Sequence, residues 1–93
     1  MEQRVIIRIV YRSEIFQEDD MWVGFCPDLD VSSFGDTPKE AQDSLKEAVE
    51  AFLEGCREIG SVDEVLTESG YVQKTGIWQL RERISKEVEA TVA

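Results

Sequence analysis

The sequence predicts an α+β fold, in which one long helix covers a three-stranded antiparallel sheet and a short helix and C-terminal strands follow. Two observations carry this prediction. Residues 5–34 form short runs that alternate between apolar and polar positions and are separated by polar turns, as strands do. Residues 41–59 instead place apolar side chains three and four positions apart, as one face of a helix does. The chain has 93 residues, of which 42% are hydrophobic, and we expect residues 1–93 to form a single domain.

The first two strands are predicted to form a hairpin. From Val5 to Ile15 the odd positions other than Ser13 are apolar, while the even positions begin apolar and become charged, which predicts one long strand. Residues 17–20 are all polar and lack periodicity, which predicts a turn. A second strand is expected from Trp22 to Cys26.

A second turn leads to the third strand and then to the long helix. Pro27 cannot donate a hydrogen bond to a sheet, and aspartates around Leu29 favour a turn before a short strand at residues 31–34. Thr37, Pro38 and Glu40 then form a capping box, in which Thr37 and Glu40 accept hydrogen bonds from each other's backbone N–H groups. The apolar face of the helix contains Ala41, Leu45, Ala48, Val49, Phe52, Cys56 and Ile59, and Gly60 is predicted to end the helix.

The C-terminal quarter is predicted to contain a short helix and a hairpin. Ser61 begins a second capping pattern, and Gly70 is its expected C-terminal end. Residues 71–74 and 77–80 flank Thr75–Gly76, as hairpin strands do. At residues 87–93 the alternation favours a strand, although Ile84, Val88 and Val92 also share one helical face.

Charge is unevenly distributed along the chain. The formal net charge is −10, and residues 13–30 contain six acids and no lysine or arginine. Such a surface repels phosphate, so we expect no direct binding of nucleic acid by this chain alone. A basic protein would be attracted instead, whereas the simpler alternative is that the acids only maintain solubility.

Composition argues against several kinds of chemistry. The chain contains no histidine, which removes the commonest acid–base catalyst at neutral pH and a frequent zinc ligand. We interpret Cys26 and Cys56 as reduced, buried thiols, with a disulfide or a reactive thiol as the alternatives. We therefore expect no enzyme, no cofactor and no metal. The absence of a signal-peptide pattern and of an apolar run of about 18 residues favours the cytosol and no membrane contact.

The order of the motifs resembles the HicB-like antitoxin family. The resemblance depends on Pro27–Asp28–Leu29, on Gly35–Asp36–Thr37, and on Glu40–Ala41 with Glu47–Ala48, and it covers residues 4–70, with 71–93 as a C-terminal extension. It implies a partial RNase H-like fold that binds and masks a HicA-like toxin, a small basic protein that cleaves messenger RNA. Family members that bind operator DNA add a two-helix unit, and this chain shows none after Gly70.

Within this resemblance, the acidic residues become candidate contacts with the toxin. Trp22 is a further candidate as an interface anchor, although we favour its packing in the core. The predicted partner-binding residues are Glu18, Asp19, Asp20, Trp22, Asp28 and Asp30.

Two other functions compete with the antitoxin prediction. In a nuclease, Asp28, Asp30 and Asp36 would form a carboxylate cluster that binds metal ions, but we favour turn and cap roles for them. The other alternative is a non-catalytic, homo-oligomeric binding module. Phe16, Trp22 and open strand edges favour self-association, and a small core makes a homodimer or homotetramer reasonable.

Overall fold

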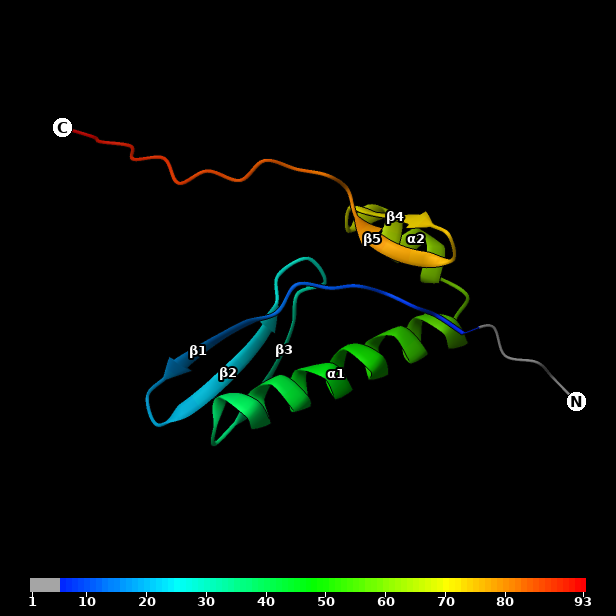
Figure 1. Cartoon of the computed structure of the whole chain (residues 1–93), viewed down its shortest axis with the longest axis horizontal. Helices are drawn as coiled ribbons and strands as arrows, with labels where there is room; N and C mark the ends of the chain where they lie inside the picture. Colours follow the sequence, from blue (N-terminus) through cyan, green and yellow to red (C-terminus); the bar gives the residue numbers. More distant parts are fainter. Residues whose placement is uncertain (1–5) are drawn as a thin grey trace, which may run out of the picture.

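The computed structural model describes residues 6–93 and confirms the predicted α+β fold. Three strands form an antiparallel sheet in the order β1-β2-β3, and β4 and β5 form a second, two-stranded sheet. In chain order the elements are β1 (Glu14–Glu18), β2 (Met21–Cys26), β3 (Val31–Gly35), α1 (Pro38–Glu58), α2 (Val62–Glu68), β4 (Tyr71–Lys74) and β5 (Ile77–Leu80) (Figure 1). No helix within residues 6–93 combines the length and apolarity needed to cross a bilayer.

The predicted long strand at residues 5–15 is wrong as a single strand. Val5 lies outside the described residues, and β1 begins only at Glu14 and continues to Glu18, so the predicted turn shortens to Asp19–Asp20. Residues 8–10 pair with β5 instead: the Trp78 N–H donates to the Arg8 carbonyl at 2.8 Å, and the Val10 N–H donates to the Trp78 carbonyl at 3.0 Å. Alternation indicates that one side of a strand is buried, but it does not specify the pairing partner. The predicted strand is therefore divided: residues 8–10 pair with the second sheet, and the chain joins the first sheet only from Glu14.

Two glycines allow α1 to lie close against one face of the first sheet. A Cβ at Gly24 would stand 2.6 Å from the Ala41 carbonyl oxygen and 3.0 Å from the Leu45 Cβ, and a Cβ at Gly35 would also meet α1. Side chains on neighbouring strand positions point to opposite faces. The row Phe16–Val23–Phe34, which pairs across all three strands, therefore lies on the face away from α1.

Helix α1 begins where the capping pattern predicts. The Thr37 hydroxyl accepts from the Glu40 N–H at 3.1 Å, but the Glu40 carboxylate accepts from the Asp36 N–H at 2.8 Å rather than from the Thr37 N–H. Ile59 is the C-terminal cap, and Gly60 follows with φ of +72°, a conformation that suits glycine. The buried side chains of α1 are Ala41, Leu45, Val49, Leu53 and Cys56.

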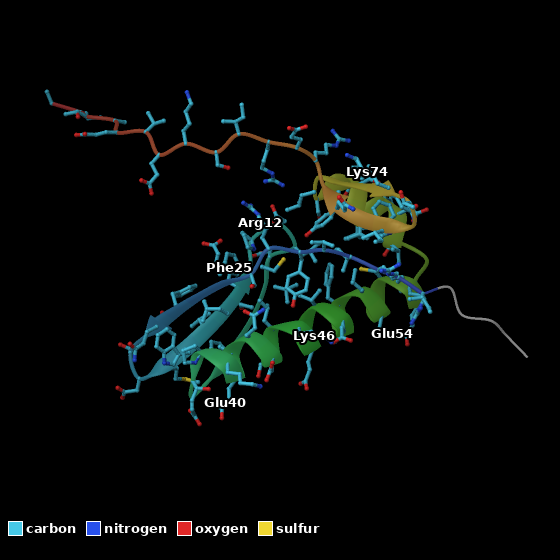
Figure 2. All side chains as sticks on the ribbon, in the orientation of Figure 1. Arg12, Phe25, Glu40, Lys46, Glu54 and Lys74 are labelled. Atoms are coloured by element: carbon cyan, nitrogen blue, oxygen red, sulfur yellow. The ribbon has the colours of Figure 1, made fainter. Side chains whose placement is uncertain are left out.

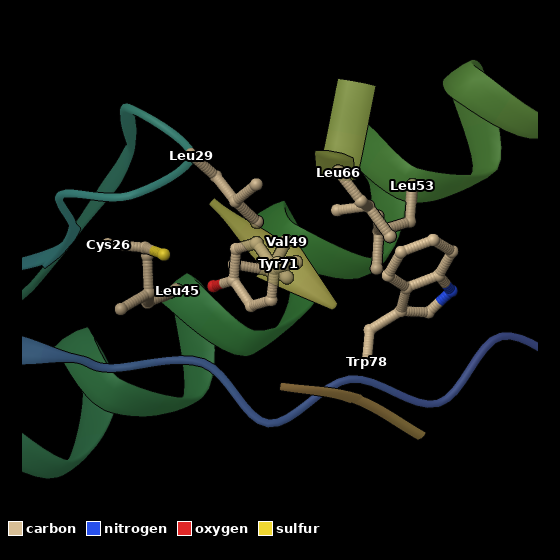
Figure 3. Close-up of a cluster of buried hydrophobic side chains, with 8 residues drawn as sticks. All are labelled: Cys26, Leu29, Leu45, Val49, Leu53, Leu66, Tyr71 and Trp78. Atoms are coloured by element: carbon tan, nitrogen blue, oxygen red, sulfur yellow. The ribbon is translucent and has the colours of Figure 1, made fainter. Parts of the chain in front are cut away.

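The main core lies along α1, between the end of the first sheet and the second sheet. The turn after β2, α1, α2 and the second sheet all contribute to it (Figure 3). Helix α2 has the predicted position, but Ser61 does not cap it, because its hydroxyl donates to the Cys56 carbonyl at 3.4 Å. The buried cluster consists of Cys26, Leu29, Leu45, Val49, Leu53, Leu66, Tyr71 and Trp78.

Residues 81–93 form an exposed tail without helix or strand, so the predicted strand at residues 87–93 is wrong. Near its start, the Arg81 N–H donates to the Gly70 carbonyl at 3.0 Å. The Arg83 Nη2 then lies 3.2 Å from the Asp28 Oδ1, and the rest of the tail extends away from the second sheet (Figure 1). A strand requires a paired neighbour, and residues 87–93 pair with no strand in the described part of the chain.

Candidate protein-binding surface

The acids predicted to bind a partner lie at the two opposite ends of the first sheet. Glu18 ends β1, and Asp19 and Asp20 form the turn to β2, where Asp19 has φ of 55°. Asp28 and Asp30 lie in the turn after β2, and β2 itself has six residues. A strand of this length separates the two turns by about 20 Å. A contiguous run of acids in the sequence therefore becomes two separate acidic regions.

Asp28 is occupied by two arginines within the chain. Its Oδ2 accepts from the Arg12 Nε at 3.1 Å, and its Oδ1 accepts from the Arg12 Nη2 and lies near the Arg83 Nη2, each at 3.2 Å. The Asp28 side chain is only 6% exposed, and its hydrogen bond and charge raise the pKa of the Arg12 guanidinium. We conclude that Asp28 stabilises the turn and holds the start of the tail, rather than presenting a charge to a partner.

The alternative carboxylate cluster is not formed. Asp30 is exposed, with φ of 55°, and precedes β3, whereas Asp36 follows β3 and lies at the start of α1. The five residues of β3 between them keep the Cα atoms of Asp30 and Asp36 about 20 Å apart. Within residues 6–93, no three carboxylate or thiol side chains gather in a geometry that would hold a metal ion.

Cys26 is buried beside Tyr71 and is a poor candidate nucleophile. Burial is the largest cause that raises the pKa of the Cys26 thiol above its ordinary value, and the reactive thiolate is therefore disfavoured. The Tyr71 hydroxyl points toward the Cys26 sulfur (Figure 3) and is fully buried. Cys26 and Cys56 are both free and buried, as predicted.

The buried phenol should make the protein sensitive to alkaline pH. Burial, together with Cys26 and Asp28, raises the pKa of Tyr71 well above its ordinary value of 10.0. The folded chain keeps the proton after the unfolded chain loses it, so this contribution to stability is complete below pH 10 and falls as the pH rises further. Tyr71→Phe should therefore lose less free energy of unfolding than the wild type between pH 9 and 11, as measured by urea denaturation. Identical losses would contradict this prediction.

Trp22 lies on the face of the sheet that α1 covers. It is two positions from Gly24, whose added Cβ would point at α1, and it is half-buried. This placement favours the core-packing interpretation of Trp22 over the interface-anchor interpretation.

Two apolar side chains are exposed among acidic residues at the end of the sheet that contains Glu18. Phe34 is 58% exposed and Met21 is 43% exposed. On the face of the sheet away from α1, a hollow of about 200 Å³ is lined by Glu18, Asp19, Met21, Val23 and Phe34. Between β3 and α1 lies a groove of about 300 Å³, which we call the acidic groove, lined by Met21, Phe34, Gly35, Asp36, Glu40, Asp43, Ser44 and Glu47.

The charge of the acidic groove is only partly neutralised. The Lys39 Nζ lies 2.7 Å from the Asp43 Oδ2, but both side chains are largely exposed, so this ion pair contributes little to stability. Among residues 6–93, no lysine or arginine forms an ion pair with Asp36, Glu40 or Glu47, the other acids of the groove. In Figure 2 the label of Glu40 marks the groove end of the sheet, and the label of Arg12 marks the opposite, Asp28 end. Among the acids that line the groove, only Asp43 has an ion-pair partner within residues 6–93, whereas Asp28 at the opposite end has two.

Four acids of the acidic groove were not predicted as partner-binding residues. Asp36, Glu40, Asp43 and Glu47 are spaced four, three and four apart, which places them on one flank of the helix and its N-terminal approach. That spacing is visible in the sequence, but capping and helix ion pairs account for it equally well. Phe34 carries a second signal, because it is a large apolar residue on the uncovered face of a short strand.

Comparisons of this chain with protein-family models, with curated proteins and with solved structures found no match. The resemblance of residues 4–70 to the HicB-like family therefore stays a prediction. What the surface binds has to be inferred from the residues that form it.

Proposed function

We propose that this chain is a non-catalytic, cytosolic antitoxin of the HicB type, which binds and masks a small basic HicA-like toxin that cleaves messenger RNA. The acidic groove, with exposed Phe34 and Met21 beside it, is the observation that carries this proposal. Exposed apolar side chains surrounded by charge are typical of protein interfaces. The excess of acid specifies a basic partner.

The overall charge supports the same partner. A chain with a net charge of −10 accelerates its encounter with a cationic protein through long-range attraction. The same field repels the phosphates of DNA and RNA. The tail carries Arg81, Arg83 and Lys86 on a backbone without helix or strand, which gives them no recognition element for a DNA groove. In this proposal operator binding is not a property of the chain alone.

A second proposed function is that of a homo-oligomeric binding module. The observation that favours it is the tail, where Ile84, Val88 and Val92 are 81–95% exposed. Burial of these side chains against another copy of the chain would remove them from water, giving a homodimer or homotetramer. Light scattering of the full chain and of a chain that ends at residue 83 would test this, since the shorter chain should then be monomeric.

The antitoxin proposal predicts a basic partner gene beside this one. A neighbouring reading frame should encode a basic protein of well under a hundred residues, and the two proteins should copurify after co-expression. Their dissociation constant should rise with salt, because screening weakens attraction between exposed charges. The proposal fails if the neighbouring frames encode no such protein, or if the two proteins elute separately at low salt.

Charge reversal would test the acidic groove in that complex. The double variant Asp43→Lys, Glu47→Lys, at two residues that line the groove, should weaken binding about tenfold and flatten its salt dependence. The matched control is Glu87→Lys, Glu89→Lys in the tail, which changes the net charge equally at exposed positions. Equal loss in both double variants would show that only net charge matters.

A further inference from the structure

Strand β3 leaves one of its backbone edges open. It pairs with β2 on one side only, and within residues 6–93 no backbone hydrogen bond reaches its other side. The outward N–H and C=O groups of an edge strand form a template for another strand. The acidic groove lies at the C-terminal end of this strand, where Phe34 and Gly35 of β3 face residues of α1.

This edge lacks the features that usually block pairing. Natural edge strands carry charged residues or proline, which discourage the addition of other chains. The edge strand β1 has Glu14 and Glu18, and β4 has Lys74. In contrast, β3 consists of Val31, Ser32, Ser33, Phe34 and Gly35. On a chain with 32% charged residues, β3 is thus an edge strand with no charged side chain or proline to oppose the addition of another strand.

The two sides of this edge differ in chemistry. On the face away from α1, an added strand would lie beside Phe34, which is an apolar neighbour. On the α1 face it would lie beside Asp43 and Glu47, whose side chains line the groove. The side chains of a strand alternate between these two faces. The strand that fits is therefore one that alternates basic and apolar residues.

We propose that β3 binds an extended basic segment of a partner protein as a fourth strand of the first sheet. About five residues of the segment would pair with β3, spanning about 16 Å. Backbone hydrogen bonds would provide affinity, and the alternating side chains would provide specificity. The binding mode rests on this edge alone, whereas the identity of the partner as a toxin rests on the proposed function.

A second copy of this chain does not fit the edge. Pairing β3 with another β3 about a two-fold axis would bring two acidic grooves together, and like charges across an interface oppose binding. The tail of another copy fits poorly for the same reason. If Ile84 and Val88 faced Phe34, then Glu87 and Glu89 would face Asp43 and Glu47.

A defined peptide tests the edge directly. The probe is a ten-residue peptide of alternating lysine and valine, titrated into the isotopically labelled full chain and followed by amide NMR shifts and hydrogen exchange. The control peptide has glutamate in place of lysine. We expect shifts and slowed exchange at residues 31–35 with the lysine peptide, weakening as salt rises, and none with the glutamate peptide. Binding of both peptides, or changes centred on β1 or the tail, would overturn the proposal.

Two phenylalanines provide matched variants for this test. Phe34→Lys places a charge on the β3 edge and removes its apolar neighbour, and it should weaken peptide binding at least about tenfold. Phe16→Lys makes the same change on β1, in the same cross-strand row and at a similarly exposed position (44%). It should leave binding within about twofold of the wild type. Equal affinities of the two variants would refute a β3 site, and amide spectra would confirm that both remain folded.

The outcome is separable from that of the antitoxin proposal. If a basic neighbouring protein binds but leaves exchange at residues 31–35 unchanged, the antitoxin proposal stands and the strand-addition proposal fails. If the lysine peptide binds at β3 but no basic neighbouring protein exists, the reverse holds. Protection of residues 31–35 in the free chain that increases with protein concentration would identify a second copy as the occupant and would also overturn the proposal.

Discussion

Replacement of Gly24 by alanine is expected to lower the free energy of unfolding by about 3 kcal/mol. The new Cβ would stand 2.6 Å from the carbonyl oxygen of Ala41, which belongs to the backbone of α1 and cannot rotate away. Relief of this overlap requires α1 to move away from the first sheet, which disrupts packing at Leu45. Urea denaturation followed by circular dichroism would measure the change.

The control for Gly24, which lies in β2, is Gly55 in α1. An added Cβ at Gly55 would meet nothing within 4 Å, and alanine favours a helix over glycine by about 1 kcal/mol. Gly55→Ala should therefore raise the free energy of unfolding while Gly24→Ala lowers it. Equal and small effects at both positions would mean that α1 does not lie as close to β2 as described.

Replacement of Asp28 by asparagine is expected to cost about 2 kcal/mol and to release the tail. The change removes the carboxylate that accepts two hydrogen bonds from Arg12 and attracts Arg83. Hydrogen bonds to charged groups contribute about 1.5–3 kcal/mol, and both arginines are half-exposed, so water solvates the charges that remain. Thermal denaturation would measure the loss, and amide exchange at residues 81–86 would report release of the tail.

Asp30 provides the matched control in the same turn. It is exposed, and its φ of 55° is a conformation that asparagine tolerates. Asp30→Asn should change stability by less than about 0.5 kcal/mol and should leave exchange in the tail unaltered. An equal loss in both variants would show that the turn, rather than the arginine contacts of Asp28, determines the effect.

The stability of the scaffold and the shape of the acidic groove depend on the same contacts. Gly24 and Gly35 allow α1 to lie directly over β2 and β3. The flank of α1 that carries Asp43 and Glu47 consequently stands near Phe34 and Gly35, at the C-terminal end of β3. Gly24→Ala should therefore weaken binding of the lysine–valine peptide even under conditions where the variant remains folded.

Most helices and strands could be predicted from the sequence because their signals are local. The turn at Pro27, the cap at Thr37 and the apolar face of α1 place β2, β3 and α1 within about a residue of their observed bounds. The Thr75–Gly76 turn likewise places β4 and β5. In each case a few neighbouring residues determine the backbone conformation, through a missing N–H, a side-chain cap or a positive φ.

The sequence by itself therefore determined the order and type of the elements and the acidic character of the surface. Only the tertiary structure decided that residues 8–10 pair with β5, that Asp28 lies between Arg12 and Arg83, and that α1 and β3 form an acidic groove. These contacts join residues far apart in the chain. Hydrophobic periodicity specifies which side chains are buried, but many strand pairings bury the same side chains, and the choice among them depends on how the helices and sheets pack together.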